Sequence, residues 1–277
     1  MRNKIDITII QNDFNSNNTP VFENLYNYIL NNKFKKNSIV ILHELSLTKY
    51  FPISKKAKNK NLSININSNE INRLKNICKQ INIYLIVSFY ENTSNSKKYN
   101  SAIVISPDGK ILGKQRKLNL PNESCYHENY YFEKNHHIKA IDIGICKIGI
   151  LICWDQWFFD NYRKLNNKGV DIIFSPTSIG VATSKSRLCT LKNEKKNWEM
   201  IIRSNSLMIN TPIIVANRCS QENDTTNSIK FWGSSFATNS DGEIIAKAKT
   251  RNQILHFSVD LRKKRESVKK WGFIESI

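Results

Sequence analysis

The spacing of apolar and polar residues along the chain predicts an alternation of strands and helices. Alternating or continuous apolar stretches are typical of strands, whereas apolar residues that recur every three or four positions are typical of helices. Strands are expected at residues 4–10, 38–43, 83–90, 101–106, 111–113, 138–143, 146–152, 170–175, 212–217, 231–238, 243–248 and 254–259. Helices are expected at residues 21–30, 70–80, 155–166 and 192–209.

The order of these elements places the chain in the α/β class with mixed sheets. Helices between successive strands favour parallel neighbours, while the turn at Pro107-Asp108-Gly109-Lys110 favours an antiparallel hairpin. About twelve strands are too many for one open sheet, so we expect two sheets packed face to face with helices outside. No repeat, linker or boundary is evident, and residues 1–277 are predicted to form a single domain.

The charge of the chain changes this picture less than its size suggests. The formal net charge is +19, which on its own would indicate a nucleic acid or an anionic membrane as partner. The lysines are, however, spread along the chain and mixed with Asn and Ile, and no aromatic residues interleave with the basic stretch Lys55–Lys60. We therefore expect no nucleic acid and no membrane as partner, and keep a polyanion-binding protein as the non-enzymatic alternative.

Two further features of the sequence bear on where the protein works. No run of about 18 apolar residues could span a membrane, and the N-terminus MRNKIDITII enters a strand without the apolar stretch of a signal peptide. The six cysteines form no C-x-x-C pair. Free thiols in a chain of this length are typical of the reducing cytosol, so a cytoplasmic location is predicted.

Cys153 is the first candidate for catalysis. It directly follows the apolar run 148–152 and precedes Trp154 and Asp155. At a junction of strand and helix, backbone N–H groups favour an anion, and we expect them to stabilise a Cys153 thiolate. A buried cysteine is also a common packing residue, so the thiol alone does not decide the question.

Three charged residues supply what a thiol needs in order to hydrolyse an amide-like bond. Glu44 ends the apolar run 38–43 and could take the thiol proton if burial raises its pKa. Lys117 and the backbone N–H of Trp154 could stabilise the oxyanion of a tetrahedral intermediate, and Glu128 could orient Lys117. Taken singly, each charge also fits a salt bridge, a surface position or a loop hydrogen bond. No histidine lies in a convincing partner motif for a Cys–His pair.

A metal centre is the alternative interpretation of four other residues, Cys125, His127, His136 and His137. Thiols and imidazoles are the usual ligands of zinc. The spacing of these residues resembles no common zinc pattern, so we expect no metal.

The order of the catalytic candidates resembles the nitrilase, or carbon–nitrogen hydrolase, superfamily along almost the entire chain. The motifs are Glu44 followed by Tyr50-Phe51, RKLNLP with Lys117, YHENYYF with Glu128 and GILICWD with Cys153. The resemblance implies a four-layer α-β-β-α sandwich, these four residues as the catalytic group, and no metal or organic cofactor. It also implies a homo-oligomer built from dimers.

Within that superfamily the chain resembles the N-carbamoylputrescine amidases. The shared strings are CWDQWF, SPTSIG at residues 175–180, FWGSSF at residues 231–236 and KWGF near the C-terminus. The resemblance implies hydrolysis of N-carbamoylputrescine to putrescine, carbon dioxide and ammonia, in polyamine synthesis. We expect Tyr50, Trp154, Gln156 and Ser178 to line the substrate pocket.

Two departures from that branch affect the expected substrate and assembly. The branch usually has Ser-Glu-Pro after SPTSIG, with the Glu near the substrate amine, whereas this chain has Val181-Ala182-Thr183. Another ureido compound, such as ureidopropionate, or an ω-amide is therefore the alternative, and Lys185 or Arg187 could bind the acid group of ureidopropionate. The sequence ends at WGFIESI, short of the usual tail of the branch, so a smaller or less stable oligomer is expected.

Overall fold

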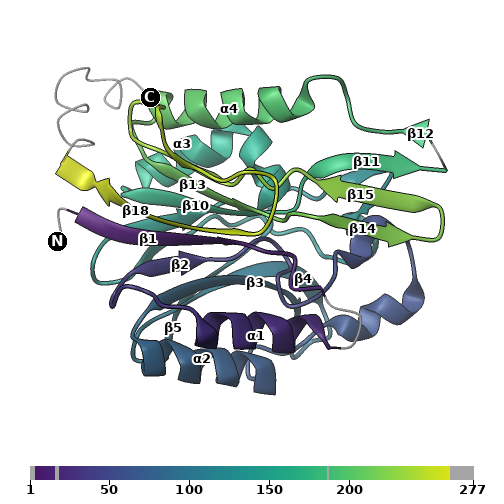
Figure 1. Cartoon of the computed structure of the whole chain (residues 1–277), viewed down its shortest axis with the longest axis horizontal. Coiled ribbons are helices and arrows are strands. Elements are labelled where there is room, and N and C mark those ends of the chain that lie inside the picture. Colours follow the sequence, from purple (N-terminus) through teal and green to yellow (C-terminus); the bar gives the residue numbers. More distant parts are fainter. Residues whose placement is uncertain (1–3, 16–18, 186, 263–277) are drawn as a thin grey trace.

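The computed structural model describes residues 4–15, 19–185 and 187–262. Two β-sheets are stacked face to face, and a pair of helices covers the outer side of each (Figure 1). One outer layer is α1 (Val21–Asn31) and α2 (Asn69–Ile81), and the other is α3 (Phe159–Asn167) and α4 (Glu194–Met208). The predicted α-β-β-α sandwich is therefore confirmed. The C-terminal strings KWGF and WGFIESI lie outside the described residues.

The first sheet has six strands in the order β18-β1-β2-β3-β4-β5. β2 is parallel to both β1 and β3, while the pairs β1–β18, β3–β4 and β4–β5 are antiparallel. The strands are β1 (Lys4–Gln11), β2 (Ile39–Ile41), β3 (Tyr84–Asn92), β4 (Lys98–Ile105), β5 (Ile111–Arg116) and β18 (Gln253–Asp260).

The second sheet also has six strands, in the order β17-β16-β13-β10-β9-β8. β10 is parallel to both β9 and β13, and the remaining pairs are antiparallel. The strands are β8 (Ala140–Asp142), β9 (Lys147–Ile150), β10 (Ile172–Thr177), β13 (Ile213–Asn217), β16 (Phe236–Thr238) and β17 (Ile244–Lys247). Both sheets are thus mixed, as predicted.

Burial on both faces of the sheets explains the continuous apolar runs of the sequence. Ile7, Ile41 and Ile150 belong to the apolar cluster between the two sheets. Val40 and Leu85 belong to a second cluster, together with residues of α1 and α2. A strand that packs against a sheet on one side and a helix on the other needs apolar residues at successive positions.

Local signals fix the helices that cover these faces, and α2 shows them well. The hydroxyl of Ser68 caps the helix by accepting the N–H of Ile71. Asn82 ends the helix in the left-handed conformation, with φ of 58°. The apolar residues between these two caps face the first sheet, as the helical spacing of Ile71 and Leu74 predicts.

Two predicted elements differ from those observed. The predicted helix 155–166 begins as a separate 3₁₀ segment, Cys153–Trp157, before α3 starts at Phe159. The predicted strand 231–238 is divided between two sheets, because Gly233 has a φ of +54° and turns the chain after Phe231.

Two smaller sheets were not predicted from the sequence. One has the strand order β12-β11-β15-β14, and the other pairs β6 with β7. Their strands are β6 (Asn122–Glu123), β7 (Tyr126–His127), β11 (Gly180–Ser184), β12 (Arg187–Leu188), β14 (Gln221–Asp224) and β15 (Asn227–Phe231). In Figure 1, β11, β12, β14 and β15 extend beyond one end of the sandwich, opposite the end at which β1 begins.

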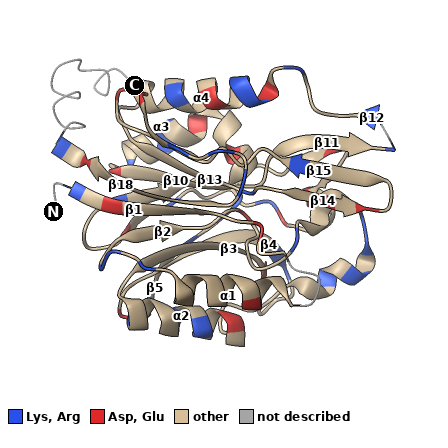
Figure 2. Ribbon diagram, viewed as in Figure 1, with Lys and Arg blue, Asp and Glu red and all other residues tan. Residues whose placement is uncertain are grey.

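The basic residues are distributed over many elements of the fold. Figure 2 shows Lys and Arg on α4, β1, β15 and the connections between strands, with Asp and Glu interspersed. Within the described ranges, none of the helices combines the length and the apolar character that crossing a membrane would require.

Candidate active site

Three of the four predicted catalytic residues follow strands of the two large sheets, and Glu128 follows a strand of the two-stranded sheet. Glu44 comes shortly after β2 and Lys117 directly after β5, while Cys153 begins the 3₁₀ segment that follows β9. Glu128 begins another 3₁₀ segment, Glu128–Tyr130, after β7. Strand ends are natural sites for chemistry, since polar groups there need not interrupt the apolar layers.

The structure brings the three charged side chains into direct contact. Lys117 Nζ lies 2.7 Å from Glu44 Oε1 and 2.7 Å from each oxygen of Glu128. All three side chains have 0% exposure. A buried cation between two buried carboxylates is stable only while each charge has its partners. This contact is the one that the predicted orienting role of Glu128 requires, and the role itself stays a prediction.

The protonation states of this cluster follow from burial and from the mutual charges. Burial alone would lower the pKa of Lys117, but the negative charges of Glu128 and Glu44 outweigh it and hold that pKa well above its ordinary value. Burial raises the pKa of Glu128 to about 7, with Lys117 opposing and Glu44 adding to the shift. Lys117 therefore stays cationic, and the Glu128 carboxyl can exchange a proton near neutral pH.

Cys153 occupies a strained position beside this cluster. Its φ is +46°, in the left-handed region that a residue with a side chain rarely adopts. Burial and the nearby charge of Glu44 raise the pKa of its thiol well above the usual value, with Lys117 opposing. The expected stabilised thiolate is therefore not supported for the resting protein, because burial and the charge of Glu44 outweigh the charge of Lys117 and a backbone hydrogen bond at Ser178.

Glu44 has one carboxylate oxygen free to act on the thiol. Its Oε1 accepts hydrogen bonds from Lys117 and, at 2.8 Å, from Asn100 Nδ2. Its Oε2 is buried and accepts no hydrogen bond from the described residues. A buried carboxylate oxygen without a donor is costly and is typical of a functional group. The charge of Glu44 also acts on Cys153, so the two side chains are near neighbours.

Asp155 joins two segments of the site: the one after β5, which carries Lys117, and the one after β9, which carries Cys153. Its Oδ1 accepts the backbone N–H groups of Leu118 at 3.0 Å and Asn119 at 2.7 Å, and its Oδ2 accepts that of Ile152 at 3.0 Å. Sequence analysis gave Asp155 no role, although its place in the CWD string was the available signal. These bonds hold Lys117 and Cys153 in a common frame.

Arg218 and Glu222 form a second buried support that sequence analysis missed. The Arg218 guanidinium donates to the backbone oxygens of Glu44 at 3.1 Å and Leu45 at 3.0 Å, and pairs with Glu222 at 2.7 Å. Glu222 in turn accepts the backbone N–H of Tyr50 at 2.6 Å. Arg218 therefore holds the segment that carries Glu44, and its place in the VANR string at residues 215–218 was the available signal.

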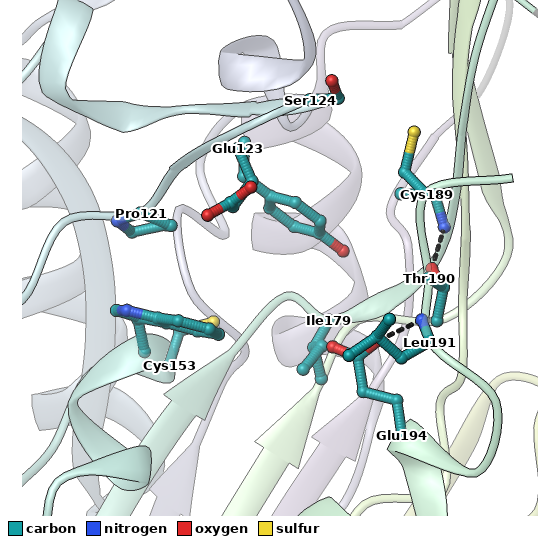
Figure 3. A pocket seen from close by; sticks show the side chains of 12 residues that line it. Pro121, Glu123, Ser124, Cys153, Ile179, Cys189, Thr190, Leu191 and Glu194 are labelled. Atoms are coloured by element: carbon teal, nitrogen blue, oxygen red, sulfur yellow. Dashed lines mark hydrogen bonds between the residues drawn. The ribbon is translucent and has the colours of Figure 1, made fainter. Parts of the chain in front are cut away.

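The pocket beside Cys153 has a volume of about 360 Å³ (Figure 3). It is lined by Pro121, Glu123, Ser124, Tyr126, Cys153, Trp154, Ile179, Ala182, Cys189, Thr190, Leu191 and Glu194. Among these lining residues are two carboxylates and no Lys, Arg or His. The pocket thus joins the Cys153 thiol to apolar walls and negative charge.

The predicted substrate-binding residues have different surroundings. Trp154 lines the pocket, as expected. The hydroxyl of Tyr50 donates to Glu128 Oε1 at 2.9 Å, and Ser178 Oγ donates to the backbone oxygen of Glu44 at 3.1 Å. Gln156 bonds Thr177 and Trp198 within the core. These three side chains are not among those that line the pocket, so substrate contact by them stays a prediction.

The segment that departs from the resembled branch reaches the pocket through one residue. Ala182, in the middle of Val181–Thr183, forms part of the pocket wall. Lys185 and Arg187, which were suggested as partners of an acidic substrate, are not among the lining residues.

The residues considered for a metal centre are not gathered into one. Throughout ranges 4–15, 19–185 and 187–262, no group of three or more His, Cys, Asp or Glu side chains is arranged to hold a metal ion. Cys125 is instead buried and lies 3.3 Å from the backbone oxygen of Thr183.

Stacked mixed sheets between helices, with this buried cluster beside Cys153, define a hydrolase of carbon–nitrogen bonds other than peptide bonds. The chain belongs to the carbon–nitrogen hydrolase family, whose sequence profile matches residues 6–267.

Comparison with known proteins gives relatives of more than one specificity. The chain is 30% identical to the citrullinase of Francisella tularensis over 271 residues, which cover 97% of this chain and 93% of the relative. It is 32% identical to the N-carbamoylputrescine amidase of Arabidopsis thaliana over 211 residues, which cover 73% and 68%. The crystal structure of a carbon–nitrogen hydrolase from Helicobacter pylori G27 superposes with a TM-score of 0.88 at 28% identity, over 99% of this chain and 95% of that one.

Proposed function

We propose that the protein is a thiol amidohydrolase that converts N-carbamoylputrescine to putrescine, carbon dioxide and ammonia. The observation that carries this proposal is the buried contact of Lys117 with Glu44 and Glu128, beside the Cys153 thiol and its acid-lined pocket. The catalytic residues are Glu44, Lys117, Glu128 and Cys153. The similarity to N-carbamoylputrescine amidases supports the choice of substrate.

The first half of the reaction acylates Cys153. The unbonded Glu44 Oε2 accepts the thiol proton as sulfur attacks the ureido carbonyl. Lys117 Nζ and the backbone N–H of Trp154 stabilise the negative oxygen of the tetrahedral intermediate. Glu44 returns the proton to the terminal nitrogen, the C–N bond breaks and ammonia leaves. The product is a thiocarbamate ester of Cys153.

The second half of the reaction releases the thiol. Glu44 takes a proton from water, whose oxygen attacks the thiocarbamate carbon, and the C–S bond then breaks as Cys153 regains its proton. The product carbamate decomposes to putrescine and carbon dioxide. Because the resting thiol has a raised pKa, a base is needed for the attack, and Glu44 is the carboxylate whose free oxygen fits that role.

The pocket supports a positively charged substrate. Glu123 and Glu194 line it, and no basic side chain does. N-Carbamoylputrescine carries an ammonium group at the end of four methylenes, and electrostatic complementarity favours such a cation over an acid. The carboxylate of ureidopropionate would meet like charge instead.

Citrulline is the second candidate substrate, because the citrullinase relative aligns over 97% of this chain. Citrulline has the same ureido end and the same ammonium, with a carboxylate added beside the ammonium. That carboxylate finds no Lys, Arg or His among the pocket-lining residues, which is why we rank it second. Another ureido compound or an ω-amide remains the broader alternative.

Ammonia release from four substrates tests the proposal. N-Carbamoylputrescine, citrulline, N-carbamoyl-β-alanine and an ω-amide are compared at equal enzyme concentration, and N-carbamoylputrescine should give the highest kcat/KM. Cys153→Ala should lose several orders of magnitude in kcat, because the covalent path disappears. Substantial activity of Cys153→Ala would refute the mechanism. A higher kcat/KM for citrulline would make citrulline the substrate in place of N-carbamoylputrescine, with the same type of reaction.

We also propose that the protein forms a homo-oligomer built from dimers. α4 exposes three large apolar side chains, Met200, Leu207 and Met208, in a protein whose apolar residues are otherwise mostly buried. Exposed apolar groups on one element favour association.

A further inference from the structure

Glu194 lies across the pocket from Cys153. It is the first residue of α4, and Figure 3 shows its carboxylate directed into the pocket, with Ile179 between it and Cys153 in this view. Its Oε2 accepts the backbone N–H of Leu191 at 2.9 Å, while Oε1 accepts no hydrogen bond from the described residues. Within those residues, Glu194 also has no Lys or Arg within ion-pair distance.

The neighbours of Glu194 connect it to the reacting thiol. Tyr126 lines the same pocket, and its hydroxyl accepts the backbone N–H of Gly180 at 3.2 Å. The pKa of that hydroxyl is raised by burial and further by the charges of both Cys153 and Glu194. Tyr126 is therefore close enough to both groups to sense their charges, and the three share one continuous cavity.

The wall between the two ends suits an alkyl chain. Ile179, Ala182 and Leu191 present apolar atoms to the cavity, and Ala182 adds only a methyl group. An alkyl chain laid along such a wall loses contact with water at little cost. A substrate that reacts at Cys153 can thus extend toward Glu194 through an apolar passage.

The carboxylate of Glu194 is prepared for a cationic partner. It is partly buried, which raises its pKa, while the N–H of Leu191 opposes that shift. A carboxylate at the first position of a helix is also favoured by the helix dipole. A partly buried carboxylate with an unused oxygen gains from a ligand that brings both a positive charge and hydrogen-bond donors.

We propose that Glu194 is the specificity-determining residue of this pocket, binding the protonated amine of a ureido-alkylamine whose carbonyl reacts at Cys153. This inference rests on the proposed function and names the residue that selects the substrate. It does not need an acid in segment Val181–Thr183, because Glu194 reaches the same cavity from α4. The class of substrate is then an amine with a terminal ureido group, separated by methylenes.

A comparison of two substrates isolates this role. N-Carbamoylputrescine and N-pentylurea have the same length, but the second has a methyl group in place of the ammonium. In Glu194→Gln, kcat/KM for N-carbamoylputrescine should fall about 10- to 100-fold, mainly through KM, because a charge-assisted hydrogen bond is lost. Activity on N-pentylurea should stay within about threefold, since no charge is bound there.

Glu199→Gln is the matched control. Glu199 also lies on α4, but it pairs with Lys247 and does not line the pocket, so both substrates should keep their kcat/KM within about threefold. Glu123→Gln is measured beside it, because Glu123 is the other carboxylate that lines the pocket. Equal losses on both substrates in Glu194→Gln would overturn the proposal, because they would indicate a structural role. A cation-specific loss in Glu123→Gln and none in Glu194→Gln would also overturn it and place the amine beside Glu123.

Binding of putrescine, measured by calorimetry without turnover, separates this inference from the proposed function. Putrescine should bind the wild-type protein at least tenfold more tightly than Glu194→Gln. If the wild type hydrolyses no ureido compound but shows this difference, the proposed function fails and the amine site stands. If hydrolysis occurs but putrescine binds the wild type and Glu194→Gln equally well, the proposed amine site is wrong and the proposed reaction is unaffected.

Discussion

At the scale of single residues, the charge balance of the site depends on Lys117. This one ammonium contacts both Glu44 and Glu128, and none of the three side chains is exposed. Two buried carboxylates that share a site repel each other, which is part of the reason why the pKa of Glu128 is already raised to about 7. Removing the cation should therefore affect both catalysis and folding.

We predict that Lys117→Met lowers kcat by about a thousandfold or more, because the oxyanion loses its cation. The free energy of unfolding should fall by about 3–5 kcal/mol, since two buried carboxylates lose their counter-charge. Ammonia release and urea denaturation measure the two effects. Lys164→Met is the control, since the exposed Lys164 pairs with the exposed Asp160 and its loss should leave kcat and the free energy of unfolding nearly unchanged. A Lys117→Met protein that keeps a tenth of wild-type kcat would contradict the assigned role.

Tyr50→Phe distinguishes a supporting role from substrate contact. The Tyr50 hydroxyl donates to Glu128 and lowers the pKa of that carboxyl, so its removal should raise the pKa above about 7. If Glu128 must be ionised to hold Lys117, activity rises with pH through that pKa, and the ascending limb of the kcat profile should move to higher pH. KM should change little. A large rise in KM with an unchanged pH profile would instead support the predicted contact with substrate.

At the scale of elements, the segments that follow β5 and β9 are held together by Asp155, a carboxylate to which we assign no chemical step. Asp155 accepts backbone N–H groups from both the Lys117 and the Cys153 connections. Burial raises the pKa of Asp155 to about 7, opposed by the charge of Lys117 and by these N–H donors. Its role is geometric, since the two connections belong to different sheets.

Asp155→Asn should weaken the hydrogen bonds between the two segments, because an amide has one acceptor oxygen where the carboxylate has two. We expect kcat to fall about 10- to 100-fold with KM nearly unchanged, and the free energy of unfolding to fall by about 1–3 kcal/mol. Steady-state kinetics and urea denaturation measure both. The exposed neighbour Asp160 provides the control, and Asp160→Asn should behave as wild type. Unchanged kcat and KM in Asp155→Asn would show that these hydrogen bonds do not position the catalytic residues.

The sequence predicted the elements whose apolar pattern is set by burial on two sides. β2, β3 and β10 are buried at almost every position, and α2 has clear capping residues. The strands of the four-stranded sheet β12-β11-β15-β14 were missed because they contain many polar residues, as in Gln221–Asp224. Their pairing is also long-range, since β11 pairs with β15, and no local pattern reports such a contact.

At the scale of the whole molecule, the candidate site depends on contacts between residues far apart in sequence. Arg218 bonds the backbone oxygen of Glu44 across 174 positions. The four candidate catalytic residues could be proposed from the sequence because each lies in a recognisable motif. Arg218, Glu222 and Glu194 could not be assigned, because their environment arises only when the two sheets and the smaller sheet pack together.

The outer face of α4 leads to a prediction about assembly. Met200, Leu207 and Met208 are each about half exposed there. Burial of such side chains against a second copy would stabilise a symmetric dimer, because apolar surface leaves water. Sedimentation velocity should therefore give a mass of at least twice the 32.2 kDa of one chain. Met200→Glu with Leu207→Glu should shift the protein toward the monomer, since burying two carboxylates is unfavourable.

Asn72→Glu is the control for this test. It distinguishes an effect of charge placed on α4 from an effect of the added negative charge alone. Asn72 lies on α2, in the opposite outer layer, where an added carboxylate should leave the sedimentation coefficient unchanged. A wild-type protein that sediments as a monomer at micromolar concentration would remove this interface. If both variants dissociate alike, the effect is one of net charge, and α4 is not the contact. Dissociation of the α4 variant alone, with full activity per chain, would show that each copy carries a complete site.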